Sequence, residues 1–396
     1  MTGQEPLRYW TADRLDTRLR QGRLAADHLR AVATHLAGFH ATARCDAEVA
    51  RHATPLALSR RVRERCDSLR SVGPAALDGR IGQLEGQLLH AVERFADRVP
   101  ARIDSGRIRE GHGGLRLERI YVDAASRAAW SPPQSDLASR AADVCADVAV
   151  LARQLAHHGR RDLAECWLAA YADAAQDYEI YVLLDLYEGL AAVELAREIA
   201  CGSGDGLGPA ELASRLRAAL AIDRPAPPVR ILVVGGLDGS GRSTLADRIA
   251  TELRAPVIAA GRVGDEREVI RRAELVLASQ RPVVVDGVFR SRADRSVLRA
   301  VASARDIPFH FVECRTDAAL RAHRLHGRAT AGEVRRSWLP AGPREGFEPV
   351  DELPREAHLV VDTSKHPSFN TALIRQRLTL PLRKVSPPDS KMISAG

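Results

Sequence analysis

Lysine is the residue that this sequence lacks most clearly. The 396 residues contain 58 lysines and arginines, but only Lys365, Lys384 and Lys391 are lysines, so 58 − 3 = 55 are arginines. This bias indicates a GC-rich coding sequence in which arginine replaces lysine wherever the exchange is tolerated. It explains how arginine can arise at a lysine position of a motif, but it does not make that exchange harmless.

Aromatic residues, paired cysteines and long apolar runs are also scarce. Aromatic residues make up 4% of the chain, so its cores must consist largely of Leu, Val, Ile and Ala. The six cysteines form no CxxC pair, which predicts reduced thiols rather than disulfides or a metal site. No run of about 18 apolar residues occurs, and the first residues lack a signal-peptide pattern. We therefore expect a cytoplasmic protein without a membrane partner.

The net charge of the chain is positive but small for its length. A net charge of +7 over 396 residues is modest, and no dense basic block occurs. Nucleic acid is therefore not an expected partner.

The length allows two domains, each with its own core. Apolar residues recur at helical spacing through most of the first 200 residues, which predicts a mainly helical domain over residues 1–222. The prolines that follow predict an extended linker at residues 223–229. Residues 230–381 are expected to form a nucleotide-binding domain, and residues 382–396 a disordered tail.

The second domain alternates short apolar runs with amphipathic helical segments. The runs "RILVVGG", "PVIAAG", "PVVVDG", "PFHFVECR" and "HLVVDT" are typical of strands buried on both faces. The pattern predicts an α/β fold with a parallel five-stranded sheet. The Gly- and Pro-rich residues 329–356 before the fifth run are long enough for a lid or binding segment.

A phosphate-binding loop is the strongest motif in the chain. Gly236, Gly241, Arg242 and Ser243 match G-x-x-x-x-G-K-[ST] except at the lysine, between a buried strand and a helix. Such glycines let backbone amides close around phosphate oxygens, and the serine hydroxyl serves Mg²⁺. The candidate nucleotide-binding residues are Gly236, Asp238, Gly239, Ser240, Gly241, Arg242, Ser243 and Thr244. The alternative is a purely structural glycine turn.

Two further groups of residues accompany this loop. Asp286 ends the third expected strand, where it can hold magnesium with Ser243, act in catalysis beside Arg242, or merely cap a turn. Arg321, Arg324 and Arg328 share one face of a later helix. We expect Arg324 and Arg328 to clamp phosphates, although a solvated face is the alternative.

Together these residues resemble the small P-loop kinases related to gluconate kinase and the zeta-toxin-like enzymes. Asp286 and Phe289 match the family's "DxxF" pattern. The resemblance implies binding of ATP and Mg²⁺ over residues 230–380. Two features depart from it: Arg242 replaces lysine, and "AAGRVGDEREVIRR" lacks the family's "SDxxR"-like substrate motif. Guanidinium is wider than ammonium, so a loss of about 10²–10³ in rate is the usual scale for a misplaced donor.

The first domain resembles the C-lobe of aminoglycoside phosphotransferase-like proteins, as found in bacterial two-part proteins in which it precedes a P-loop kinase domain. His112 and Gly113 match the family's "HGD" loop, but Gly114 stands at the aspartate and Arg119 at the later catalytic-loop position. The metal-binding aspartate corresponds to Ser131. We also expect the family's N-lobe to be missing, because no glycine-rich loop and no lysine precede His112. The resemblance therefore implies an inactive domain.

Three other acidic residues of the first domain have no catalytic interpretation. Asp136 lies near the lost metal position but in the wrong context. Asp143 and Asp147 are spaced by one helical turn, which suggests either a metal-binding face or, as we favour, a solvated helix face.

These observations lead to one main hypothesis and two alternatives. The main one is an ATP-binding, kinase-like protein that transfers phosphate slowly to an unidentified small-molecule or protein acceptor, with an inactive first domain. The first alternative is a pseudoenzyme that acts as a nucleotide-sensing, scaffold or regulatory module. The second is a nucleotide-driven switch that uses residues 329–356 as a lid.

Overall fold

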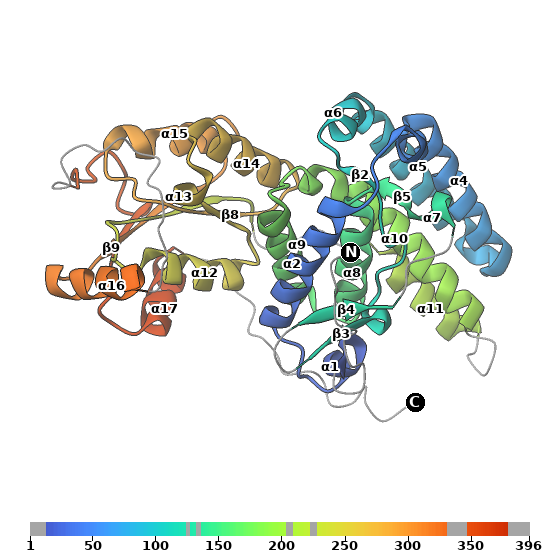
Figure 1. Ribbon diagram of the computed structural model, residues 1–396, viewed down its shortest axis with the longest axis horizontal. Coiled ribbons are helices and arrows are strands. Elements are labelled where there is room, and N and C mark those ends of the chain that lie inside the picture. Colours follow the sequence, from blue (N-terminus) through green and yellow to red (C-terminus); the bar gives the residue numbers. More distant parts are fainter. Residues whose placement is uncertain are drawn as a thin grey trace. The chain divides into compact units, whose positions relative to one another are not determined.

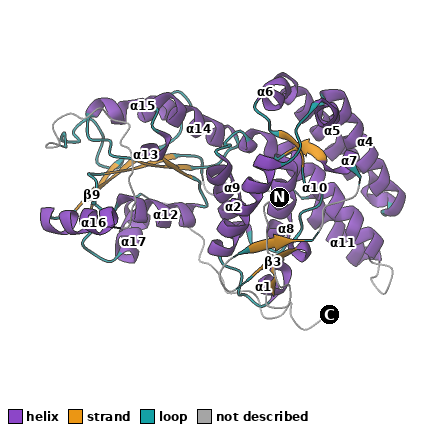
Figure 2. Ribbon diagram, viewed as in Figure 1, coloured by secondary structure: helices purple, strands orange, loops and turns teal. Residues whose placement is uncertain are grey.

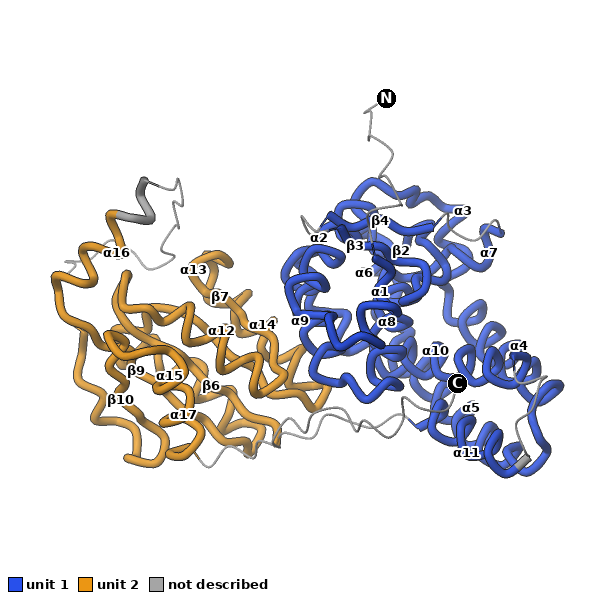
Figure 3. The backbone as a smooth tube through the Cα atoms, turned by 90° about the horizontal axis from the view of Figure 1, so that it is seen from below, with its two compact units in different colours: residues 1–224 blue, residues 225–396 orange. Residues whose placement is uncertain are grey.

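The computed structural model describes residues 13–123, 127–131, 136–202, 209–221, 228–330 and 347–378. The chain divides into two compact units, residues 1–224 and 225–396 (Figure 3). Most of the expected linker, the expected tail and the centre of the expected lid lie outside the described residues. Within the described residues, no helix is long and apolar enough to cross a membrane.

Unit 1 is mainly helical, with short strands among its helices (Figure 2). Its helices are α1 (Leu15–Arg20), α2 (Ala26–Thr42), α3 (Ala47–Ala50), α4 (Pro55–Val72), α5 (Asp78–Phe95), α6 (Val99–Asp104), α7 (Leu137–Arg140), α8 (Cys145–His157), α9 (Arg161–Ala175), α10 (Ile180–Gly202) and α11 (Pro209–Leu220). Helix α10 is apolar around most of its circumference and packs against α4, α5, α8 and α11. It is therefore the central helix of this unit.

Two small antiparallel sheets complete unit 1. Their strands are β1 (Asp13–Arg14), β2 (Ile108–Glu110), β3 (Ile120–Val122), β4 (Ala128–Trp130) and β5 (Ala141–Asp143). Strand β3 pairs with β1 and β4, while β2 pairs with β5. The loop at residues 111–114 follows β2, and the backbone N–H groups of His112 and Gly113 donate to Asp147 in the first turn of α8.

Unit 2 is built on a parallel sheet with the order β10-β9-β6-β8-β7. Its strands are β6 (Ile231–Gly235), β7 (Val257–Ala259), β8 (Val283–Asp286), β9 (Phe309–Arg315) and β10 (His358–Asp362). Its helices are α12 (Arg242–Leu253), α13 (Ala260–Val263), α14 (Glu266–Ala278), α15 (Arg292–Ser303), α16 (Ala318–Thr330) and α17 (Pro367–Arg377).

Helices cover both faces of this sheet, with α14 and α15 on one side and α12 and α17 on the other (Figure 1). Every residue of β6 and β8 is buried, as two covered faces require. The predicted combination of a mainly helical N-terminal region with a parallel five-stranded C-terminal sheet is confirmed.

Candidate functional site

The loop between β6 and α12 has the backbone of a phosphate-binding loop. Gly239 and Gly241 have positive φ angles of 81° and 84°, which side chains other than glycine rarely adopt. A Cβ on Gly239 would lie 2.8 Å from the carbonyl oxygen of Arg321 in α16. The loop therefore needs glycine both for its conformation and for its packing against α16.

Three amides of this loop have no acceptor in the described residues. Within the described parts of the chain, no hydrogen-bond acceptor faces the backbone N–H groups of Gly239, Gly241 and Arg242. They lie at the N-terminus of α12, where the helix dipole also favours negative charge. The buried hydroxyl of Ser240 likewise lacks a partner in the described residues. This arrangement fits the oxygens of a phosphate group.

Arg242 lies across the loop rather than away from it. Its Nη1 donates to the carbonyl of Gly236 at 2.7 Å, and its Nη2 to Asp238 at 3.0 Å. Its Nε donates to Asp286 at 3.1 Å. The guanidinium therefore braces the loop and pairs with the aspartate at the end of β8.

Asp286 and Ser243 form a pair of oxygen donors. The Ser243 hydroxyl donates to Asp286 Oδ2 at 2.7 Å, and the carboxylate is buried at the carboxyl end of β8. Within the described residues, no cluster of three or more His, Cys, Asp or Glu side chains could hold a metal. Two protein oxygens nevertheless fit Mg²⁺, which keeps several waters and takes its other ligands from phosphates.

A cavity of about 280 Å³ adjoins the loop. Its lining residues are Gly241, Thr244, Leu245, Arg324, Thr363, Lys365, Pro367 and Asn370. Arg324 donates to the carbonyls of Gly239 at 3.4 Å and Thr363 at 2.8 Å, so it ties α16 to the loop and to the residue after β10. Arg324 thus lies beside the loop, and its role as a phosphate clamp stays a prediction, whereas the side chain of Arg328 lies outside the described residues.

Residues 363–370, which follow β10, form one wall of this cavity, and the sequence did not predict their part in the site. The Thr363 hydroxyl contacts the carbonyl of Ser240, and the buried Asn370 side chain donates to the carbonyl of Asp362 at 2.9 Å. Within the described residues, Asn370 Oδ1 has no partner. The signal was present: "DTSK" follows a predicted parallel strand and contains Lys365, the first lysine of the chain.

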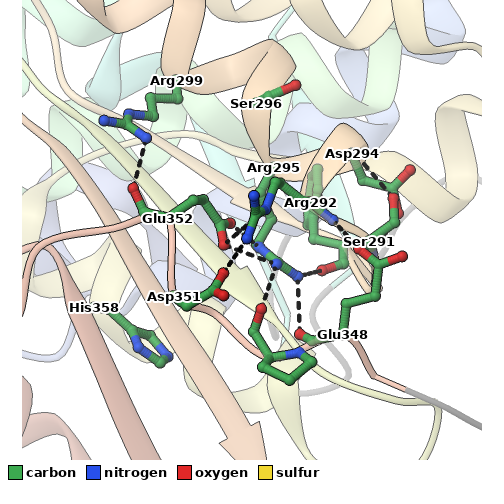
Figure 4. Close-up of polar contacts among 12 residues, drawn as sticks. Ser291, Arg292, Asp294, Arg295, Ser296, Arg299, Glu348, Asp351, Glu352 and His358 are labelled. Carbon is green, nitrogen blue, oxygen red and sulfur yellow. Dashed lines mark hydrogen bonds and ion pairs between the residues drawn. The ribbon is translucent and has the colours of Figure 1, made fainter.

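Behind Asp286, a fully buried arginine fixes the turn that follows β8. Arg295 of α15 donates to both carboxylate oxygens of Glu352, at 2.6 and 3.2 Å (Figure 4). Its remaining donors reach the carbonyls of Phe289, Arg290, Glu348 and Pro349. The turn after Asp286 is thereby held against residues 348–352, and Phe289 remains buried with a φ of 48°.

The loop at His112 in unit 1 is closed by an aspartate. Asp147 accepts the backbone N–H groups of His112 at 2.6 Å and Gly113 at 2.9 Å, and it contacts His40 Nε2 at 3.2 Å. Burial alone would raise the pKa of Asp147, but the bonds from His40 and His112 hold it below its usual value. This carboxylate is fully engaged in maintaining the loop.

The interpretation of Asp143 and Asp147 as a solvated helix face is wrong. Asp143 lies in β5, not on a helix, and both carboxylates are buried. Asp143 accepts two hydrogen bonds from Arg102, at 2.7 and 2.8 Å, and Arg102 also pairs with Asp177. Asp143 and Asp147 therefore belong to two separate buried hydrogen-bond networks.

The structure also brings together the other residues singled out in unit 1. His112 Nε2 lies 2.9 Å from the carbonyl of Ser131, whose N–H donates to the carbonyl of Arg119. Gly114 lies beside them without a side chain, so it offers no carboxylate. Asp136 caps α7 by accepting the N–H groups of its first turn.

Unit 2 matches a known protein family over most of its described residues. Residues 231–339 match a family described as an AAA domain. This match includes the phosphate loop, Asp286 and α16. Unit 2 is therefore similar to this family over these residues and has the parallel sheet and glycine loop of a P-loop fold. The likeness of unit 1 to phosphotransferases stays a prediction.

Relatives and solved structures add little about the substrate. Proteins of Mycobacterium tuberculosis and Mycobacterium bovis, named only as uncharacterized, are 26% identical over 81% of this chain and 71% of theirs. A sugar kinase from Janibacter sp. HTCC2649 is 18% identical over 39% of this chain and 96% of its own, with a TM-score of 0.29. A gluconokinase from Sinorhizobium meliloti 1021 is 22% identical over 40% and 94%, with a TM-score of 0.28.

Proposed function

We propose that unit 2 binds ATP with Mg²⁺ at the phosphate loop and transfers a phosphoryl group to a small-molecule acceptor. The observation that carries this proposal is the set of open amides at Gly239, Gly241 and Arg242. Such amides stabilise phosphate oxygens without the cost of reorganising the protein.

Each neighbouring residue has a distinct part in this proposal. Ser243 and Asp286 would hold the magnesium ion, which supplies charge neutralisation on the phosphates when bound. Asp286 would also receive the proton of an acceptor hydroxyl. The cavity beside Arg324 would take the base, with Asn370 Oδ1 accepting from an exocyclic amine.

Arg242 is the reason to expect slow turnover. Its three donor nitrogens are committed to Gly236, Asp238 and Asp286. These bonds engage three of the five N–H groups of the guanidinium, and turning it toward a phosphate would break some of them. We therefore propose that the loop binds nucleotide more readily than it promotes transfer.

Titration calorimetry with ATP and Mg²⁺ tests the proposal. We expect Mg²⁺-dependent binding in the micromolar to millimolar range, which Ser243→Ala and Gly241→Asp weaken. Ser296→Ala is the matched control, because this exposed hydroxyl of α15 bonds, among the described residues, only to the Ala293 carbonyl. Absence of heat with every nucleotide would contradict the proposal.

The Arg242–Asp286 pair also favours a second candidate, a nucleotide-binding regulatory module without turnover. In this case Arg242→Lys and Asp286→Asn leave the cellular function unaltered, while surface changes in unit 1 abolish it. Gly114 and Ser131, which stand where the resembled family has carboxylates, support the accompanying proposal that unit 1 is an inactive kinase-like lobe.

A further inference from the structure

Unit 1 contains a cavity of its own, unrelated to the phosphate loop. It has a volume of about 390 Å³ and lies among α4, α8, α10 and the loop at Gly113 and Gly114. Its lining includes four arginines and three carboxylates: Arg61, Arg65, Arg116, Arg153, Asp147, Glu194 and Glu198. This volume is in the range of pockets for small ligands.

The arginines of this cavity are only partly matched by carboxylates. Arg116 pairs with Glu194 at 3.7 Å and with Glu198. Arg61 instead donates to the carbonyls of Ala138 at 2.9 Å and Ala141 at 3.0 Å. Carbonyl groups satisfy the hydrogen bonds of a guanidinium but do not neutralise its charge.

Glu194 and Glu198 contribute less negative charge to the cavity than two free carboxylates would. Glu194 is shared with Arg197, which lies 2.7 Å away. Burial raises the pKa of Glu198 to about 7, although Arg116 opposes this, so a large share of Glu198 is protonated at neutral pH. Burial also lowers the pKa of Arg65, with Glu194 as the main opposing charge. A bound anion would relieve the desolvated positive charge of Arg65.

The nearby loop holds one buried carboxylate, that of Asp147, at the cavity. Gly114 has no side chain, and it stands where the resembled family has an aspartate. The Asp147 carboxylate accepts the amides of His112 and Gly113 but keeps its negative charge. The four arginines of the lining still outnumber its three carboxylates, so a positive surplus remains.

From these contacts we infer that the cavity binds a small phosphomonoester. Arg61, Arg65 and Arg116 lie on its wall from α4 and from the segment after Gly114. Guanidinium groups recognise phosphate with paired, charge-assisted hydrogen bonds. The rest of the cavity accommodates the polar body of the ligand.

Calorimetry on the full chain with glucose 6-phosphate, in chloride buffer without Mg²⁺, tests this inference. We expect binding of glucose 6-phosphate but not of glucose, and a loss of at least about tenfold in affinity with Arg65→Met. Arg60→Met is the matched control, because Arg60 lies on the same helix with its side chain 79% exposed. It should bind as the unchanged chain does.

A phosphate-loop variant separates this cavity from the site in unit 2. Arg242→Gln should leave the binding of glucose 6-phosphate unchanged. If Arg242→Gln removes the binding and Arg65→Met does not, or if the unchanged chain shows no binding, the inference is wrong. Circular dichroism and thermal unfolding verify the fold, and Arg61→Met serves in place of Arg65→Met if the latter does not fold.

Discussion

Each unit holds an aspartate beside a glycine-containing loop, but the two aspartates are used differently. In unit 1, Asp147 accepts the amides of His112 and Gly113 directly. The backbone N–H groups of Gly111, His112 and Gly113 all donate to acceptors within the protein. The loop is therefore a closed structural turn.

In unit 2, Asp286 accepts from the side chains of Ser243 and Arg242. Side chains can exchange partners by rotating, and in the described residues the amides of Gly239 and Gly241 face no acceptor. The comparison teaches that glycines alone do not make a phosphate site. What matters is whether the backbone donors remain available.

Removing the two aspartates should separate these roles, and the largest effect is expected at Asp147. Asp147→Ala leaves buried donors unsatisfied, so we expect the free energy of unfolding of unit 1 to fall by about 3–5 kcal/mol. Denaturant unfolding measures this change, and nucleotide binding should persist. Asp136→Ala, at an exposed helix cap, should cost less. An equal loss in both variants would contradict the structural role of Asp147.

Asp286→Asn should instead act on turnover. We expect phosphotransfer or ATP hydrolysis to fall by about 10²–10³-fold with little change in unfolding, because in our proposal Asp286 holds the magnesium ion. Steady-state kinetics with purified protein measure this effect. Asp351→Asn, in an exposed pair with Arg292, is the control. Unchanged turnover would remove Asp286 from the mechanism.

Arg242→Lys tests whether the hydrogen bonds of Arg242 to Gly236, Asp238 and Asp286 limit the rate of turnover. Lysine has one nitrogen at its end and cannot keep all three bonds of Arg242, so Asp286 should be released. We expect turnover to rise about tenfold or more, which corresponds to about 1.4 kcal/mol of barrier. Arg248→Lys on the exposed side of α12 should change nothing. No gain in turnover would favour the module without catalysis.

The smallest expected effect concerns the response of unit 2 to acid. Burial, with Arg230 as a second cause, lowers the pKa of His310 from 6.5 to about 4. The unfolded chain therefore takes up this proton at a higher pH than the folded chain. The stabilising contribution is complete above about pH 6.5 and is lost as pH falls toward about 4.

His310→Leu should make the unfolding free energy of unit 2 less dependent on pH in this window, by an amount on the order of 1 kcal/mol. Thermal unfolding at a series of pH values measures the dependence. His323→Leu, at an exposed position of α16, is the control. A pH dependence identical to that of the unchanged chain would exclude His310 as a cause.

Much of unit 2 could be predicted from the sequence because its signals are local. Runs such as "VVVD" reveal strands buried on both faces, and the spacing of Gly236 and Gly241 reveals the loop between strand and helix. The position of Asp286 follows from the rule that ligands bind at the carboxyl ends of parallel strands.

The remainder depends on contacts between distant segments. The three bonds of Arg242, the cavity wall at Asn370 and the closure of the unit 1 loop by Asp147 are properties of the folded chain. The error at Asp143 has the same origin. A spacing of four residues was interpreted as one helix, whereas a strand ends and a helix begins between the two aspartates.

Lys365 gives the cavity beside the phosphate loop a distinctive chemical property. It lines that cavity, and its ammonium lies 5.1 Å from the ring centre of Phe369. Since Lys384 and Lys391 are the only other lysines of the chain, amine-selective acylation has very few side chains to modify. A single acylated peptide would therefore report the occupancy of this cavity, and a nucleotide that fills it should protect Lys365 from the reagent.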